Sequence, residues 1–256
     1  MQFIATADTD IGISKKTNQD SLLIRHASTG NENEEVLMAI VCDGMGGLEK
    51  GELASATVIR AFAKWFEEEL PYELGNIDMQ IVGAKWSLLL KKLNADILQY
   101  SQKKGCDGMG TTFSGVLFVG EKYLIVHVGD SRVYHIDSSL IQMTTDHTFV
   151  AREVSRGTIT PEQAKTDKRR NLLLQCVGAS GVVEPQVICG KTEKGAYMLC
   201  SDGFRHEISG EEMYDILNPI NLLNKDAMHN KTKYLIGQAK KRKEKDNISV
   251  ILIKVK

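Results

Sequence analysis

The spacing of hydrophobic residues changes along the chain, and each spacing predicts a different kind of element. Residues 36–42 form an apolar run that does not alternate with polar residues, which is typical of a buried strand. Apolar residues recur at intervals of three and four over 51–70 and again over 79–103, which predicts two amphipathic helices. Pro71 is expected to stop the first helix and Gly105 to end the second.

The other apolar runs are shorter, rich in branched residues and separated by Gly or Asp turns, which is typical of strands. They predict two strands with a turn between them over 3–24, and strands over 111–119, 123–128, 131–136, 182–189, 196–201 and 247–255. Further helices are predicted over 211–217 and 232–243, and a polar loop over 26–35. Because tight turns join most neighbouring strands, we expect antiparallel sheets with helices packed outside, an α+β layered fold.

Residues 147–178 break the succession of strands. Thr160-Pro161-Glu162-Gln163 combines a capping box with proline at the first helical position, which marks a helix start. We therefore expect a helical flap at about 147–178. No repeat or linker divides the sequence, so residues 1–256 are predicted to form a single domain that carries this flap.

Composition excludes several classes of protein. The formal net charge of −1 gives no field that favours nucleic acid or acidic lipid. The N-terminus lacks a basic region and a long apolar run, and no run approaches a membrane span, so we expect a cytoplasmic protein without membrane attachment. Four of the five cysteines lie in apolar runs without a C-x-x-C pair, which predicts reduced core thiols.

Five aspartates lie where predicted strands begin or end. They are Asp20, Asp43, Asp130, Asp202 and Asp246. In antiparallel sheets the end of one strand lies beside the start of its neighbour, so all five can gather at one edge. Carboxylates gathered there would repel one another unless cations lie among them, and an all-oxygen set favours Mg²⁺ or Mn²⁺. Any one of them could instead be a turn residue, and Asp43 could cap the following helix.

The sequence lacks the motifs of several other catalytic mechanisms. No cysteine is followed six residues later by arginine, as a cysteine-dependent phosphatase requires. Gly190-Lys191-Thr192 lacks the preceding glycine of a P-loop, and no histidine belongs to an H-E-x-x-H motif. His127 and His135 lie in predicted strands, where packing or exposure is expected rather than metal ligation. The basic run 240–243 predicts a solvated helix end rather than a nucleic-acid site.

The ordered set of motifs resembles the metal-dependent Ser/Thr protein phosphatase family, type 2C, of the bacterial kind. The matching stretches run through almost the whole chain: 12–20, Asp43-Gly44-Met45-Gly46-Gly47, 51–55, Gly110-Thr111-Thr112, 128–132, Thr145-Asp146-His147, 157–162, 199–203 and 245–250. The resemblance implies two packed antiparallel β-sheets flanked by α-helices, an αββα sandwich. It also implies a binuclear metal centre at one end of that sandwich.

The resemblance assigns ligands by position. Asp43 would bridge two Mn²⁺ or Mg²⁺ ions, the Gly44 carbonyl would bind one of them, and Asp202 and Asp246 would complete a shell. Asp20 matches the acidic position that supports the site.

A third, weaker ion would lie near the flap, held by Asp130 and Asp202. The flap itself is expected to modulate the access of substrate.

The resemblance implies hydrolysis of phosphoserine and phosphothreonine on proteins by direct attack of a metal-bridging hydroxide. Lys15 lies where the family usually has a phosphate-clamping arginine, and it is either a phosphate contact or a solvated loop lysine. Gln19 replaces an outer glutamate. Met45 replaces the histidine proposed as general acid in animal members, which leaves the proton donor to the leaving group unassigned.

The rival interpretation is a catalytically weak phosphatase-like regulatory or binding module. Asp43, Asp202 and Asp246 are all present, which favours an active enzyme. Expected partners are phosphoprotein substrates and a partner Ser/Thr kinase, and we expect a monomer that binds no nucleic acid.

Overall fold

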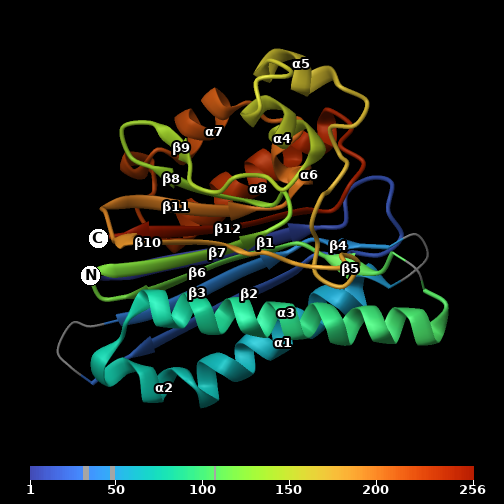
Figure 1. Ribbon diagram of the computed structural model, residues 1–256. Helices are drawn as coiled ribbons and strands as arrows, with labels where there is room; N and C mark the ends of the chain where they lie inside the picture. Colours follow the sequence, from blue (N-terminus) through green and yellow to red (C-terminus); the bar gives the residue numbers. More distant parts are fainter. Residues whose placement is uncertain (31–34, 47–49, 107) are drawn as a thin grey trace.

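The computed structural model describes residues 1–30, 35–46, 50–106 and 108–256, and it shows two stacked five-stranded sheets with helices on both outer faces (Figure 1). Part of the predicted loop 26–35 and Gly47 of the glycine motif lie outside the described residues. All strand pairings in the two sheets are antiparallel. The structure therefore confirms the predicted α+β sandwich.

The first sheet has the strand order β1-β12-β11-β8-β9, with β1 Phe3–Asp10, β12 Ile248–Val255, β11 Gly195–Cys200, β8 Arg132–Ile136 and β9 Leu140–Gln142. The second has the order β10-β7-β6-β3-β2, with β10 Gln186–Lys191, β7 Lys122–Val128, β6 Phe113–Val119, β3 Glu35–Cys42 and β2 Ser21–Ser28. A short ribbon of β4 Gly44–Met45 and β5 Gly110–Thr111 lies at one end of the sandwich (Figure 1).

Helices cover each sheet separately. The second sheet is covered by α1 Gly51–Glu68 and α3 Met79–Lys104, joined by the short α2 Leu70–Glu73 and a 3₁₀ turn, Leu74–Asn76. The first sheet is covered by α6 Asp202–Arg205, α7 Gly210–Leu217 and α8 Lys225–Lys241, with a 3₁₀ turn at Pro219–Asn221. The flap contains α4 Phe149–Ser155 and α5 Pro161–Thr166. None of the helices in the described ranges is both long and apolar enough to cross a membrane.

The position of β3 in the fold explains the unbroken apolar pattern of its sequence. Met38 and Ile40 pack against the helices, whereas Leu37, Ala39 and Val41 point into the layer between the sheets. Both faces of the strand are therefore buried, and neither needs polar residues. The same strand ends at Cys42, directly before Asp43, so a strand that is buried on both faces carries a carboxylate at its tip.

Several predicted boundaries were wrong, each for a local reason. The first helix ends at Glu68, and Pro71 lies in the first turn of α2, where its missing amide proton is tolerated. The strand β2 continues to Ser28 because it pairs with β3 along its whole length. The strand β10 begins at Gln186 rather than at residue 182.

The last helix begins seven residues earlier than predicted. The Asn224 side chain caps α8 by accepting a hydrogen bond from the Ala227 amide at 2.8 Å. The polar first turns that follow hide the helical period in the sequence. The capping box at Thr160, by contrast, is confirmed, because Thr160 and Gln163 exchange both hydrogen bonds at the start of α5.

Candidate metal centre

Strand register brings the predicted aspartates to one end of the sandwich. Ser21 pairs with Cys42, so Asp20 and Asp43 lie on neighbouring chain segments at the same edge. Cys200 pairs with Val250, which likewise places Asp202 near the start of β12 and Asp246. Asp20, Asp43, Asp202 and Asp246 are called the acidic centre below.

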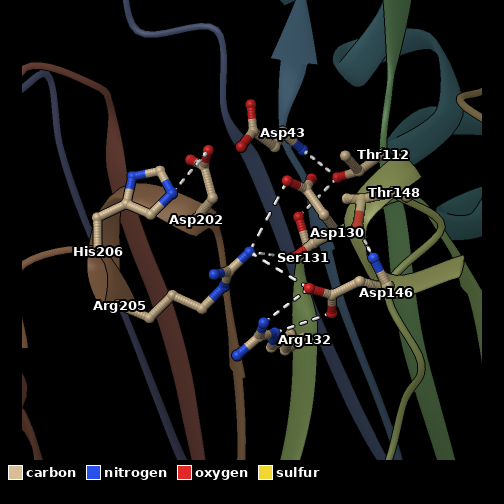
Figure 2. Close-up of polar contacts among 12 residues, drawn as sticks. Asp43, Thr112, Asp130, Ser131, Arg132, Asp146, Thr148, Asp202, Arg205 and His206 are labelled. Atoms are coloured by element: carbon tan, nitrogen blue, oxygen red, sulfur yellow. Dashed lines mark hydrogen bonds and ion pairs between the residues drawn. The ribbon is translucent and has the colours of Figure 1, made fainter. Parts of the chain in front are cut away.

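The backbone of Asp43 is held by hydrogen bonds to two threonines. Its amide donates to Thr112 Oγ1 at 2.9 Å, and its carbonyl accepts from the Thr112 amide at 2.8 Å and from Thr111 Oγ1 at 2.9 Å. Thr112 also hydrogen-bonds to the Ser131 hydroxyl at 2.7 Å, which ties Asp43 to the segment that carries Asp130 (Figure 2). These contacts give the Gly110-Thr111-Thr112 motif a structural role, which is to hold the backbone of Asp43.

The charges of the acidic centre are not balanced within the protein. Burial raises the pKa of the Asp43 carboxyl well above its usual value, and the charges of Asp20, Asp202, Asp130 and Asp246 raise it further. Burial also raises the pKa of Asp20 to about 7; the nearby Ser249 and Ser201 hydroxyls oppose this rise, and the charges of Asp202 and Asp246 add to it. Both carboxylate oxygens of Asp20 and Oδ1 of Asp202 are buried without a hydrogen-bond partner. Buried carboxylate oxygens without partners are the groups that a hard divalent cation would satisfy.

Two glycines let the loops of the acidic centre approach one another. A Cβ at Gly44 would lie 2.4 Å from the carbonyl oxygens of Gln19 and Gly51, and a Cβ at Gly203 would lie 2.2 Å from the Asn247 carbonyl oxygen. Only glycine fits such backbone contacts. The Gly44 carbonyl is thereby held directly beside Asp43, and the Asp202 turn is held against the Asp246 turn.

Asn247 joins the N-terminal loop to the Asp246 turn, a role that the sequence did not reveal. Its Nδ2 donates to the carbonyls of Ile11 and Thr17 at 3.0 and 3.2 Å, and its Oδ1 accepts from the Gln19 amide at 2.9 Å. The loop that carries Lys15 is therefore fixed on both sides to the turn that follows Asp246.

Lys15 lies on the solvent-exposed side of the acidic centre, beside Asp246. Its Nζ contacts Asp246 Oδ1 at 2.7 Å, and the lysine side chain is 40% exposed. Burial alone would lower the pKa of Lys15, but the hydrogen bond with Asp246 and the charges of Asp43 and Asp202 outweigh it and raise the pKa. Lys15 is thus a protonated cation beside the carboxylates, within reach of solvent.

Asp130 lies beside the acidic centre, but its neighbours include the basic side chain of Arg205. Arg205 Nη2 donates to the Asp130 carbonyl at 2.9 Å and lies 3.7 Å from its Oδ2, while Arg132 binds Asp146 through two hydrogen bonds of 2.8 and 2.7 Å (Figure 2). Asp130, Arg132, Asp146 and Arg205 are called the arginine cluster below. Burial and the charge of Asp202 raise the pKa of Asp130 to about 7, and Arg205 opposes this. Sequence reasoning missed Arg205, because it lies 75 residues from Asp130 in the chain.

His206 is a second neighbour that the sequence did not indicate. Its Nε2 lies 3.5 Å from Asp202 Oδ2, and its Nδ1 lies 3.5 Å from Glu244 Oε2. The hydrogen bond with Glu244 and the charge of Asp202 raise the pKa of His206 above its usual value. The imidazole thus lies between the carboxylates of Asp202 and Glu244, which favour its protonated form.

The side chains of the acidic centre are close neighbours but do not form a closed coordination shell. Among the residues in the described ranges, no three His, Cys, Asp or Glu side chains converge tightly enough to make a metal site by themselves. Their charges nevertheless act on one another strongly enough to raise the pKa of Asp43.

The remaining candidate ligands lie in the core. His127 is buried, hydrogen-bonds with Ser114 at 2.9 Å and with the Gly129 carbonyl at 3.0 Å, and burial lowers its pKa to about 3. All five cysteines are free, and Cys42, Cys176 and Cys200 are buried. The core position is therefore confirmed for three of the four cysteines predicted there, whereas Cys189 is half-buried, and His127 is packed in the core.

Comparison with known proteins agrees with the resemblance seen in the motifs. A family model described as "Protein phosphatase 2C" matches residues 13–245. A putative protein phosphatase 2C-type of Streptococcus pyogenes is 30% identical over 249 residues, covering 96% of this chain and 94% of that protein. The solved serine/threonine phosphatase of S. agalactiae superposes with a TM-score of 0.87 at 27% identity and covers 100% of both chains.

The catalytic domain of the serine/threonine protein phosphatase PstP, solved in complex with two manganese ions, superposes with a TM-score of 0.77 at 30% identity. That match covers 98% of this chain and 97% of the other. The two-sheet sandwich is thus shared with solved phosphatases that match along almost their whole length. This chain belongs to the protein phosphatase 2C family.

Proposed function

We propose that this chain is a divalent-metal-dependent protein phosphatase that hydrolyses phosphoserine and phosphothreonine. The observation that carries the proposal is the acidic centre, where four half-buried aspartates lie at one end of the sandwich and three of their carboxylate oxygens are buried without a partner. The family and the two manganese ions bound by the PstP catalytic domain support the same conclusion.

The donor set fits Mn²⁺ or Mg²⁺. Asp43, the Gly44 carbonyl, Asp202 and Asp246 would hold the ions. Asp20 would support the site through its unpartnered carboxylate oxygens. When bound, the ions would supply Lewis acidity that activates water and stabilises the charge that develops on the phosphoryl group.

The protein's own residues then orient the substrate. Lys15 would contact a phosphoryl oxygen, since its protonated Nζ lies beside Asp246 at the exposed side of the centre. The lysine ammonium is a point charge, whereas the planar guanidinium of an arginine can bind two oxygens at once. We therefore expect Lys15 to make a single contact with the phosphoryl group. Met45 follows Gly44 and cannot donate a proton, so protonation of the leaving group requires another donor.

The substrates are expected to be phosphoproteins, and a partner Ser/Thr kinase is the natural source of them. The flap over 147–178 would modulate their access to the centre. A monomer and a cytoplasmic location stay predictions.

The test is hydrolysis of p-nitrophenyl phosphate and of a phosphothreonine peptide with Mn²⁺ and with a chelator. We expect turnover only with metal, and Asp43→Asn should lower kcat/KM by more than about a hundredfold, because even residues that support a ligand are worth ten to a hundredfold. Asp96→Asn makes the same chemical change at an exposed position of α3 and should leave activity unchanged. Absence of metal-dependent turnover would favour the regulatory module, and full activity of Asp43→Asn would refute the assignment of the site.

A further inference from the structure

We propose that the Arg205 guanidinium is the permanent cation of Asp130, so that the centre binds two divalent ions and none at Asp130. The inference rests on the proposed function, because it concerns how many ions the centre takes. It departs from the expectation that Asp130 and Asp202 together hold a third ion.

The position of Arg205 carries the inference. Arg205 ends α6, three residues after Asp202, and its side chain crosses to the segment that follows β7. Its Nη2 lies 2.9 Å from the Asp130 carbonyl oxygen, 3.7 Å from Asp130 Oδ2 and 3.9 Å from Asp146 Oδ2 (Figure 2). The side chains of Arg205 and Asp130 are each only 12% exposed, so this contact lies in the interior, where screening by salt and water is weak.

A divalent ion at Asp130 would have to share this space. Mg²⁺ binds oxygen at about 2.0–2.1 Å. An ion on Asp130 Oδ2 would therefore lie close to the guanidinium, whose Nη2 is 3.7 Å from that oxygen. Two positive groups at that separation in a buried site repel strongly. The ion would also compete for the carbonyl oxygen that already accepts a hydrogen bond from Nη2.

The balance of charge in the arginine cluster points the same way. Arg132 is engaged by Asp146 through two hydrogen bonds, which leaves Arg205 to serve Asp130. Two guanidinium groups therefore face two carboxylates, so the formal charges of the cluster balance, while burial and the charge of Asp202 still raise the pKa of Asp130. In the acidic centre, Lys15 and His206 stand against four aspartates, so a need for added cations remains there.

The test counts bound manganese. Wild type, Asp130→Asn, Arg205→Thr and Arg205→Lys are titrated with Mn²⁺ into the millimolar range, and free Mn²⁺ is followed by electron paramagnetic resonance. We expect two ions for the wild type, two for Asp130→Asn, and three for Arg205→Thr, in which the resident charge is gone. Arg205→Lys, which keeps a positive charge, should stay at two.

Three ions on the wild type and two on Asp130→Asn would overturn the inference and leave the phosphatase proposal intact. A count that stays at two in a folded Arg205→Thr would also overturn it, because Arg205 would then not be the excluding group. If Arg205→Thr does not fold, the comparison of wild type with Asp130→Asn still decides between two and three ions. A wild type that binds no manganese would refute the proposed function, and this inference with it.

Discussion

The acidic centre and the arginine cluster lie side by side, yet the pKa values of Asp43 in the first and of Asp146 in the second shift in opposite directions. Asp130 shares the raised pKa of the acidic centre, because burial and the charge of Asp202 act on it. In the acidic centre, burial and neighbouring carboxylates raise the pKa of Asp43. In the arginine cluster, burial would raise the pKa of Asp146, but Arg132 and Arg205 outweigh it and lower the pKa. Burial of carboxylates is therefore not what marks a metal site. The mark is burial without an internal cation of matching charge.

The difference predicts that substitutions in the two regions change different properties. Residues of the arginine cluster should govern the stability of the fold, whereas residues of the acidic centre should govern metal binding and turnover. Removal of one partner of a compensated pair leaves a buried charge alone.

The largest effect is expected for Arg132→Ala. Asp146 would lose both of its short hydrogen bonds and stay buried as a charge, which should lower the free energy of unfolding by about 3–5 kcal/mol. Urea denaturation would measure this. The matched control is Lys91→Ala, because Lys91 pairs with Glu184 at 3.0 Å on the surface, where loss of the pair should cost less than about 1 kcal/mol. Equal losses for the two variants would contradict the comparison.

A smaller effect is expected for Thr112→Val, which tests how the acidic centre is held. Valine keeps the shape of threonine but cannot accept the hydrogen bond from the Asp43 amide. Because Thr112 acts through Asp43, the substitution should lower kcat/KM and the affinity for Mn²⁺ by about ten- to a hundredfold. Thr112→Ser keeps the hydroxyl and should restore most of both. Unchanged Mn²⁺ affinity in Thr112→Val would show that Thr112 does not position the ligand.

The smallest expected effect is on how folding stability depends on pH. The urea midpoint of the chelator-treated protein, measured over a range of pH, would report it. Asp20 has a pKa of about 7 when folded and near 3.8 when unfolded, so the unfolded chain releases this proton first and stability falls as pH rises between those values. Asp146 has a lowered pKa when folded, so its contribution is present above about 3.8 and is lost as the solution becomes more acidic. Asp20→Asn should flatten the decline toward neutral pH. A decline of unchanged slope in that variant would remove Asp20 as its cause.

The sequence predicted the features that depend on neighbours in the chain and missed those that depend on distant partners. The unbroken apolar run of β3 and the capping box at Thr160 are local patterns, and both are confirmed. The five aspartates could be gathered because antiparallel pairing turns strand ends into neighbours. Arg205 and Asn247 could not be assigned, because each acts on residues 75 or more positions away, and only the packing of α6 and β12 reveals the contact.

The burial of β3 on both faces has a consequence for the motions of the molecule. Both edges of this strand are paired, with β2 and with β6, so its amides can exchange with solvent hydrogen only when the sandwich as a whole opens. Asp43 extends directly from this strand. We therefore expect β3 and the backbone of Asp43 to belong to the slowest-exchanging part of the protein. An ion bound at Asp43 would then be released by movement of the surrounding loops rather than by movement of Asp43.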